Sequence, residues 1–124
     1  MKRAILLVDH GSRRDDANAQ LGEVAEAVRR RLPGEIVEFA HMELAEPTIA
    51  QAFARCVEQG AHQVVVHPYF LAPGRHSTED IPSMVKKVAR AHPELSATVT
   101  QPLGLDPRMS QIILDRIQAE LDGL

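Results

Sequence analysis

The feature that most constrains this fold is a short apolar run, residues 4–8 (Ala-Ile-Leu-Leu-Val), which is followed at once by Asp9, His10 and Gly11. An apolar run without polar alternation predicts a strand that is buried on both faces, as in a parallel sheet covered by helices. The residues directly after such a strand lie at the carboxyl edge of the sheet, where open α/β folds bind their ligands. The sequence therefore predicts that His10 lies at a binding edge, although an imidazole there is equally able to serve as a cap for the strand.

The rest of the chain repeats this strand-and-helix unit. Further strands are predicted at residues 35–41, 64–66 and 96–100, and amphipathic helices are predicted to begin near residues 15, 46, 77 and 107. The first and third strands are the most apolar and are expected in the middle of the sheet, so right-handed crossovers give the strand order 2-1-3-4. We therefore predict one α/β domain over residues 1–124, with a single four-stranded parallel sheet and helices on both faces, as in flavodoxin-like folds.

Charge and composition exclude several classes of partner. The chain has 14 Lys and Arg against 17 Asp and Glu, so it has no overall basic field that would attract nucleic acid or an anionic membrane. Its apolar runs fall short of the ~20 residues that span a bilayer, and the first is too short for the core of a signal peptide. The one cysteine, Cys56, cannot form an internal disulfide and fits a reducing compartment. We expect a cytoplasmic protein with no nucleic-acid partner and no membrane partner.

Three residues that could bind a metal ion follow successive strands. His10 comes after the first strand, Glu43 after the second and His76 in the long loop after the third, at equal intervals of about one strand-and-helix unit. Two imidazoles and a carboxylate suit a borderline divalent cation such as Co²⁺, Fe²⁺, Ni²⁺ or Zn²⁺, and three protein ligands leave positions open for exchange. The sequence therefore predicts a site from which a metal ion can be passed on.

Other polar side chains are predicted at the same edge. Arg13 and Arg75 are candidates for binding carboxylates, with Ser12 as a further hydrogen-bond donor, although arginines at such positions are as often solvated charges. His67, at the end of the third strand, is a candidate for contact with a substrate. His41, at the end of the second, is a candidate for supporting the site from behind.

Five motifs, in order over nearly the whole chain, resemble the sirohydrochlorin chelatases of the CbiX type. They are residues 6–13 (Leu-Leu-Val-Asp-His-Gly-Ser-Arg), 42–47 (Met-Glu-Leu-Ala-Glu-Pro), 65–76 (Val-Val-His-Pro-Tyr-Phe-Leu-Ala-Pro-Gly-Arg-His), 80–82 (Asp-Ile-Pro) and 102–104 (Pro-Leu-Gly). The long loop with its terminal histidine is the most specific of them. Asp9 is a departure, because a small residue often precedes the motif histidine in that family.

The resemblance implies a chelatase-like form of the fold and the insertion of Co²⁺ or Fe²⁺, with Ni²⁺ a further candidate, into sirohydrochlorin during cobalamin or sirohaem biosynthesis. The metal is then a substrate, and no organic cofactor is expected. The resemblance also implies that His10, His76 and Glu43 handle the metal. Because sirohydrochlorin is a flat apolar ring with carboxylates at its rim, Phe70 and Leu71 are expected along the cavity wall. A chain of this length is expected to act as a homodimer.

Two other functions are compatible with parts of this pattern. A metal or tetrapyrrole carrier would use the same residues without turnover. A histidine phosphatase also places a histidine and a glycine after its first strand, but it requires an arginine directly before the histidine. Asp9 stands there and would repel a phosphate, so this alternative is disfavoured.

Overall fold

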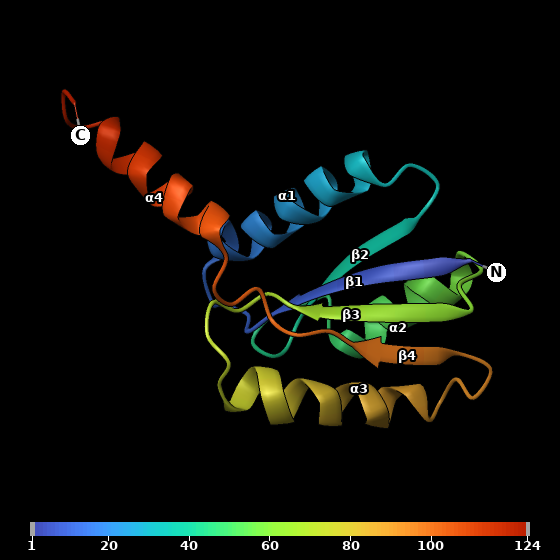
Figure 1. Ribbon diagram of the computed structural model, residues 1–124. Helices are drawn as coiled ribbons and strands as arrows, with labels where there is room; N and C mark the ends of the chain where they lie inside the picture. The colour runs from blue at the N-terminus through green and yellow to red at the C-terminus, as the bar shows by residue number, and fades with distance from the viewer. Residues whose placement is uncertain (1, 124) are drawn as a thin grey trace.

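A computed structural model describes residues 2–123, except for the side chains of residues 76 and 77. Strands and helices alternate along these residues, as Figure 1 shows. The elements are β1 (Arg3–Asp9), α1 (Asp15–Arg31), β2 (Ile36–His41), α2 (Ile49–Glu58), β3 (Gln63–Pro68), the π-helical turn η1 (His76–Asp80), α3 (Ile81–Ala89), β4 (Ser96–Val99) and α4 (Pro107–Gln118). The prediction of one domain over residues 1–124 includes Met1 and Leu124, which lie outside the described residues, and it stays a prediction.

The strands form a parallel sheet with the order β2-β1-β3-β4. The predicted α/β class and strand order are confirmed. β1 is an inner strand, and its Leu7 is aligned with Phe39 of β2 on one side and with His67 of β3 on the other. Because all the strands are parallel, the segments that follow β1, β2 and β3 emerge side by side at one edge of the sheet.

Helices lie on both faces of the sheet, as predicted, but they cover the two faces unequally. α2 and α3 pack on one face, where Leu6, Phe53, Val66 and Ile81 belong to a large buried cluster. On the other face α1 packs over β1 and β2, and the buried cluster there is small: Leu7, Leu21, Ala25 and Val37. Most of the apolar surface that stabilises the fold is therefore buried on the α2–α3 face.

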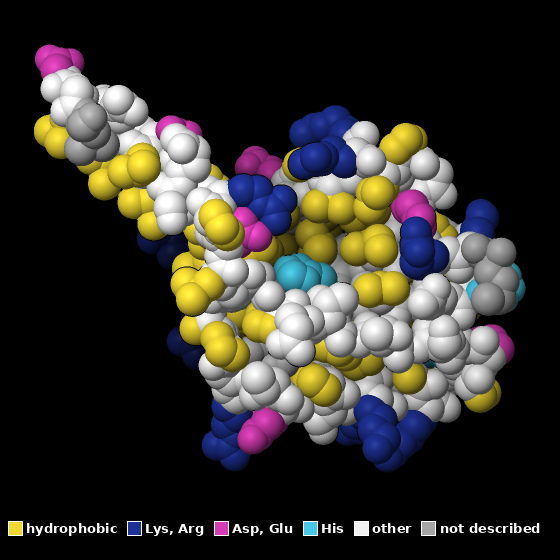
Figure 2. Space-filling view, in the orientation of Figure 1, with side chains coloured by type: hydrophobic (Ala, Val, Ile, Leu, Met, Phe, Trp, Pro, Cys, Tyr) yellow, Lys and Arg dark blue, Asp and Glu magenta, His cyan; other side chains and the backbone are white. Residues whose placement is uncertain are grey.

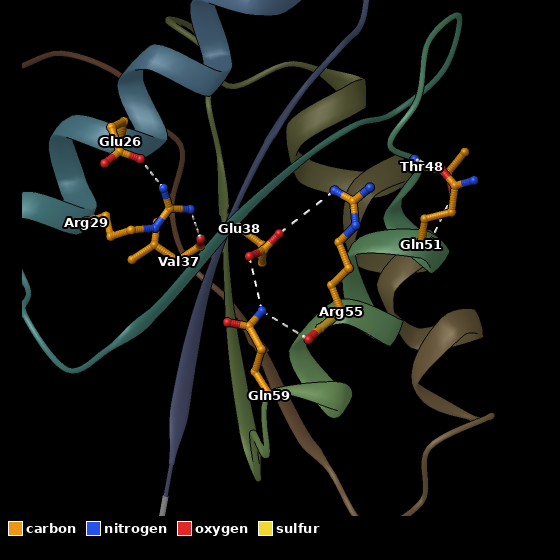
Figure 3. A network of polar contacts seen from close by, with 8 residues as sticks. All are labelled: Glu26, Arg29, Val37, Glu38, Thr48, Gln51, Arg55 and Gln59. Atoms are coloured by element: carbon orange, nitrogen blue, oxygen red, sulfur yellow. Dashed lines mark hydrogen bonds and ion pairs between the residues drawn. The ribbon is translucent and has the colours of Figure 1, made fainter.

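Polar contacts fasten the edge strand β2 to the helices on either side of it (Figure 3). From α1, the Arg29 guanidinium donates a hydrogen bond to the Val37 carbonyl of β2. From α2, Gln59 Nε2 donates to the Glu38 carboxylate at 3.1 Å. At the other end of α2, Thr48 and Gln51 form a capping box, in which each side chain accepts from the other residue's backbone N–H. The contacts at Val37 and Glu38 hold the first half of β2 between the two helices.

β3 and the last helix differ from the predictions. The three valines of β3 indicated a strand buried on both faces, but burial alternates along it, so that Val64 and Val66 are buried whereas Val65 is only partly so. α4 has the apolar stripe that was predicted, yet none of its residues, all of which are described, is buried. In Figure 1 it extends away from the sheet. Val65 is only partly buried because α4 extends away, and no helix of the described chain lies over β3 on the α1 side.

Candidate functional site

The segments after β1 and β2 stay paired beyond the ends of the strands. The Met42 N–H donates to the Asp9 carbonyl at 2.8 Å, and the Glu43 N–H donates to the His10 carbonyl at 3.0 Å. This backbone pairing places the two candidate ligands side by side, with His10 Nε2 2.9 Å from Glu43 Oε1. Both side chains are accessible from outside, since 40% of the His10 side chain and 53% of the Glu43 side chain are exposed. The structure therefore brings together two of the three predicted metal ligands.

Gly11 permits this close approach. Its φ of +95° is in the left-handed region that favours glycine, and a Cβ atom built at this position would lie 1.8 Å from the Glu43 carbonyl oxygen. Any side chain at position 11 would therefore push the two segments apart. From the sequence, Gly11 could permit a close backbone approach or be only a turn residue, and the structure identifies the Glu43 carbonyl as the group that approaches it.

The other ring nitrogen of His10 faces a backbone oxygen. Nδ1 lies 3.2 Å from the Gly11 carbonyl, which can only accept a hydrogen bond. Nε2 faces Glu43 Oε1 at 2.9 Å, and a carboxylate oxygen also only accepts, so without a metal ion a proton on Nε2 joins the two side chains. A divalent cation that displaced this proton would be bound by the Nε2 lone pair and the Glu43 carboxylate.

The third predicted ligand, His76, has a side chain that lies outside the described part of the structure. Its backbone begins η1, and the loop before it is closed by Thr78, whose N–H donates to the Gly74 carbonyl at 2.9 Å. Among the described side chains, no group of three or more His, Cys, Asp or Glu is placed to hold a metal ion. Because the His76 side chain is not among these, the three-ligand site stays a prediction.

A hollow of about 260 Å³ connects Glu43 with the element that follows His76. Its lining consists of Glu43 and Met42 from the segment after β2, Asp80 at the end of η1, and Ser83 and Met84 of α3. Asp80 and Ser83 were not among the predicted site residues, although Asp80 belongs to a motif that the sequence analysis noted. Glu43 therefore contacts His10 and also lines the hollow that reaches the start of α3.

Behind the site, Asp9 and His41 form a pair. His41 Nδ1 lies 2.6 Å from Asp9 Oδ1, and the His41 side chain is only 1% exposed. The two residues are aligned across β1 and β2, and they lie on the α1 face, next to Phe39. The pair joins the carboxyl ends of the two strands that carry His10 and Glu43, so it supports the site without reaching the hollow.

The predicted substrate-binding residues are distributed more widely. Arg13 is exposed. Arg75 Nε lies 3.5 Å from Glu79 Oε2, and the side chains of Arg75 and Glu79 are both largely exposed. Leu71 is 65% exposed, whereas Phe70 packs against the large buried cluster. Ser12 is part of the turn before α1, where its Oγ accepts from the Arg14 N–H at 3.0 Å.

His67 lies on the α1 face, because Val66 and Pro68 on either side of it are buried on the opposite one. Its Nδ1 is 2.9 Å from Thr100 Oγ1, and that hydroxyl itself donates to the Gln101 carbonyl, so His67 is the donor of this pair. Burial lowers the pKa of His67 below its ordinary value. Its ring therefore contacts Thr100 and Gln101, in the segment that follows β4.

A model of a known family, CbiX, matches residues 4–120. The chain belongs to the CbiX family. This confirms the resemblance inferred from the motifs.

Relatives of this CbiX chain carry two related names. It is 47% identical over 114 residues to the chloroplastic sirohydrochlorin ferrochelatase of Arabidopsis thaliana, an alignment that covers 92% of this chain and 51% of the relative. It is 36% identical to the sirohydrochlorin cobaltochelatase of Methanocaldococcus jannaschii, over 91% of this chain and 96% of the relative. The CbiX chain thus spans about half the length of the first relative and nearly all of the second.

A solved structure has the same fold. The sirohydrochlorin chelatase SirB from Bacillus subtilis subspecies spizizenii, in complex with cobalt, matches with a TM-score of 0.89 at 32% identity, over 96% of this chain and 51% of the other. In the described part of the CbiX chain, no helix is long and apolar enough to cross a membrane.

Proposed function

We propose that this protein is a lyase that inserts Co²⁺ or Fe²⁺ into sirohydrochlorin, in cobalamin or sirohaem biosynthesis. The observation that carries the proposal is the pair formed by His10 Nε2 and Glu43 Oε1, 2.9 Å apart at the carboxyl edge of the sheet and open to the outside. Membership of the CbiX family supports the substrate, since the relatives named above are sirohydrochlorin chelatases. The metal is a substrate here, with Ni²⁺ as a third candidate.

The reaction exchanges one divalent cation for two protons. Each metal ion that enters the macrocycle displaces the protons of two pyrrole N–H groups, so the site must present the cation and also accept protons. The Nε2 lone pair of His10 and the Glu43 carboxylate are able to do both in turn. His76 is proposed as the third ligand, because its loop leads directly into η1 and α3, which line the hollow beside Glu43.

The substrate contacts are proposed from exposure and position. Arg13 and Arg75 carry exposed guanidinium groups that suit the carboxylates at the rim of the macrocycle. Leu71 offers an exposed apolar surface, and Phe70 supports it from the core. Contact of Ser12 and His67 with the substrate stays a prediction from the sequence.

We further propose that the working form is a homodimer in the cytoplasm. A flat macrocycle has two broad faces. This chain matches about half of the Arabidopsis relative, and a second copy would supply a second set of contacts across the substrate. The cytoplasmic location is supported by the single, buried Cys56, because a reducing compartment does not require cysteines to be paired.

The deciding experiment is a spectroscopic insertion assay with purified protein, sirohydrochlorin and each of Co²⁺, Fe²⁺ and Ni²⁺, compared with the rate without protein. His10→Ala, His76→Ala and Glu43→Gln should each reduce the rate at least a hundredfold. His62→Ala is the matched control, since His62 is exposed and precedes β3 at the opposite edge. Full activity of His10→Ala would contradict the assignment. Tight binding of metal and macrocycle without any acceleration would identify a carrier instead.

A further inference from the structure

Asp9, directly before His10, has a partner on the neighbouring strand. Its Oδ1 lies 2.6 Å from His41 Nδ1, and because a carboxylate oxygen only accepts, the ring is the donor of this hydrogen bond. The pair lies on the α1 face of the sheet, where Leu7 is buried and Phe39 packs against the small buried cluster. In Figure 2 hydrophobic side chains gather on this side of the molecule, beneath α1. Because an unpaired carboxylate or imidazole is costly in apolar surroundings, the hydrogen bond constrains the ends of β1 and β2.

His41 also forms the base of the segment that bears Glu43. Its backbone N–H donates to the Pro47 carbonyl at 2.8 Å, and it forms an isolated parallel bridge with Thr48. Residues 42–46 therefore leave β2 and return to its last residue as a closed loop. Glu43 is the second residue of this loop, so its position depends on the base that His41 provides.

The loop adopts a conformation that its own residues do not favour. Leu44, directly after Glu43, has a φ of +71°, in the left-handed region that residues with a side chain disfavour. The Leu44 side chain is 52% exposed, so burial in the core contributes little to holding it there. Backbone conformations of this kind persist where the surrounding structure imposes them, and they are common at functional sites. The position of Glu43 is therefore held by contacts at the base of the loop and along β1.

The same histidine lies beneath the turn that bears His10. A Cβ atom built at Gly11 would lie 3.1 Å from His41 Cβ, so the two segments pass close together there. Asp9 and Gly11 flank His10 in the chain, and His41 is close to both of them. One residue thus adjoins the turn of His10 and also closes the loop of Glu43.

We propose that Asp9 and His41 are positioning residues that hold the Glu43 carboxylate against His10 in the arrangement that binds the metal ion. The inference rests on the chelatase function proposed above and gives Asp9 a part in it. The Met42 N–H bond to Asp9 and the Glu43 N–H bond to His10 join the same two segments, and the side-chain bond adds a third tie behind them. Without this tie, we expect β1 and β2 to stay paired and the Glu43 carboxylate to lose its fixed distance from His10 Nε2.

Binding of Co²⁺ to the protein alone, followed by calorimetric titration, measures this arrangement without turnover. His41→Phe keeps an aromatic ring but removes the donor, and it should weaken Co²⁺ binding at least tenfold, an effect typical of residues that support metal ligands. His41→Asn offers an amide N–H in nearly the place of Nδ1 and should stay within about threefold of the wild-type affinity. Unchanged binding by His41→Phe would overturn the proposal.

Val37→Ala is the matched control for loss of packing. Val37 is 1% exposed and points to the same face of β2 as His41, but it lies in the first half of the strand, away from the Glu43 loop. This variant should lower the free energy of unfolding in urea and leave Co²⁺ binding unchanged. Equal weakening of Co²⁺ binding by Val37→Ala would mean that lost stability explains the effect of His41→Phe, and the positioning role would fall.

Variants of Asp9 separate the hydrogen bond from the charge. Asp9→Asn keeps an oxygen that accepts from His41 Nδ1 and should bind Co²⁺ nearly as the wild-type protein does, whereas Asp9→Ala should resemble His41→Phe. Because the Asp9 side chain is 22% exposed and ends its strand, Asp9→Ala also keeps the test available if His41→Phe does not fold. Binding by Asp9→Asn as weak as that by Asp9→Ala would mean that the carboxylate acts on the cation through its charge, which contradicts the proposal.

A combined variant tests whether the pair acts through Glu43. Once Glu43→Gln has removed the ligand, adding His41→Phe should weaken Co²⁺ binding by less than about twofold further, because effects within one network do not add. A full additional loss would indicate a general structural effect and rule out the positioning role. Insertion by the unmodified protein is assayed separately. If insertion fails while His41→Phe still weakens Co²⁺ binding, the chelatase function is wrong and the positioning role stands.

Discussion

The two faces of the sheet differ in how completely they are covered, although the same strands supply both. On the α2–α3 face, alternate residues of β1 and β3 such as Leu6 and Val66 are fully buried. On the α1 face the neighbouring residues Ile5 and Val65 are only partly buried. One face therefore contributes most of the stability of a single chain, and the other leaves apolar side chains partly exposed. The difference shows that a parallel strand is buried on both faces only if the topology supplies a helix on each.

The strongest test compares a phenylalanine from each face. Phe53 of α2 is 0% exposed in the large cluster, whereas Phe39 of β2 is partly exposed in the small one. Phe53→Ala should lower the free energy of unfolding by about 3–5 kcal/mol, and Phe39→Ala by less than half of that. Equilibrium denaturation by urea measures both. Equal losses would show that the two faces contribute equally.

A matched pair of valines gives a smaller but cleaner contrast. Val66→Ala removes two methyl groups from a fully buried position and should cost about 2 kcal/mol, whereas Val65→Ala should cost less than about 1 kcal/mol in the monomer. Equilibrium denaturation by urea measures both costs, and equal costs would contradict the contrast between the two faces.

Cysteine reactivity compares the faces without changing stability much. Burial, with a smaller contribution from the nearby Glu38 carboxylate, raises the pKa of the Cys56 thiol to about 12. The thiolate is the reactive form, so Cys56 should resist alkylation by iodoacetamide at pH 8 in the folded protein. A cysteine introduced at Thr98 should react at least a hundredfold faster at low protein concentration. Rapid labelling of Cys56 in the native state would contradict the closed character of the α2–α3 face.

The same thiol predicts how stability responds to alkaline pH. A group whose pKa is raised on folding contributes stability below its unfolded pKa, which is near 9. That contribution is lost as the pH rises towards the folded pKa of about 12. Cys56→Ala should therefore lose less of its free energy of unfolding between pH 9 and pH 11 than the wild-type protein.

Local patterns predicted the elements and the edge of the sheet that carries the site. The apolar run of residues 4–8 identified an inner strand, and two polar segments after adjacent strands had to meet, which placed His10 beside Glu43. The pairing of Asp9 with His41 needed the register of β1 and β2, which single strands do not reveal. The second helix was predicted to begin near residue 46, but it begins at Ile49. Its capping box consists of Thr48 and Gln51, whose spacing in the sequence is typical of the start of a helix.

What the sequence could not reveal was which element covers which surface. The valines of β3 have the β-branched side chains that any inner strand favours, whether or not a helix lies over them. The stripe of α4 shows that the helix needs an apolar partner, and it does not name that partner. A strand pattern also does not say toward which face His67 points, because a shift of one residue in register reverses every side chain. These are properties of tertiary contacts between distant segments.

His67, on the α1 face of the sheet, offers the smallest and most specific test of how far that face is covered. Its pKa is lowered because burial disfavours the charged ring, so the folded protein binds a proton there less readily than the unfolded chain does. The stability that this group contributes is present above its ordinary pKa near 6.5 and is lost as the pH falls through the lower folded value. Between pH 7.5 and pH 5.5, His67→Gln should therefore lose less free energy of unfolding than the wild-type protein, whereas His62→Gln should behave like the wild type. Equal losses in the wild-type protein and in His67→Gln would mean that the α1 face covers His67 too little to disfavour its charged form.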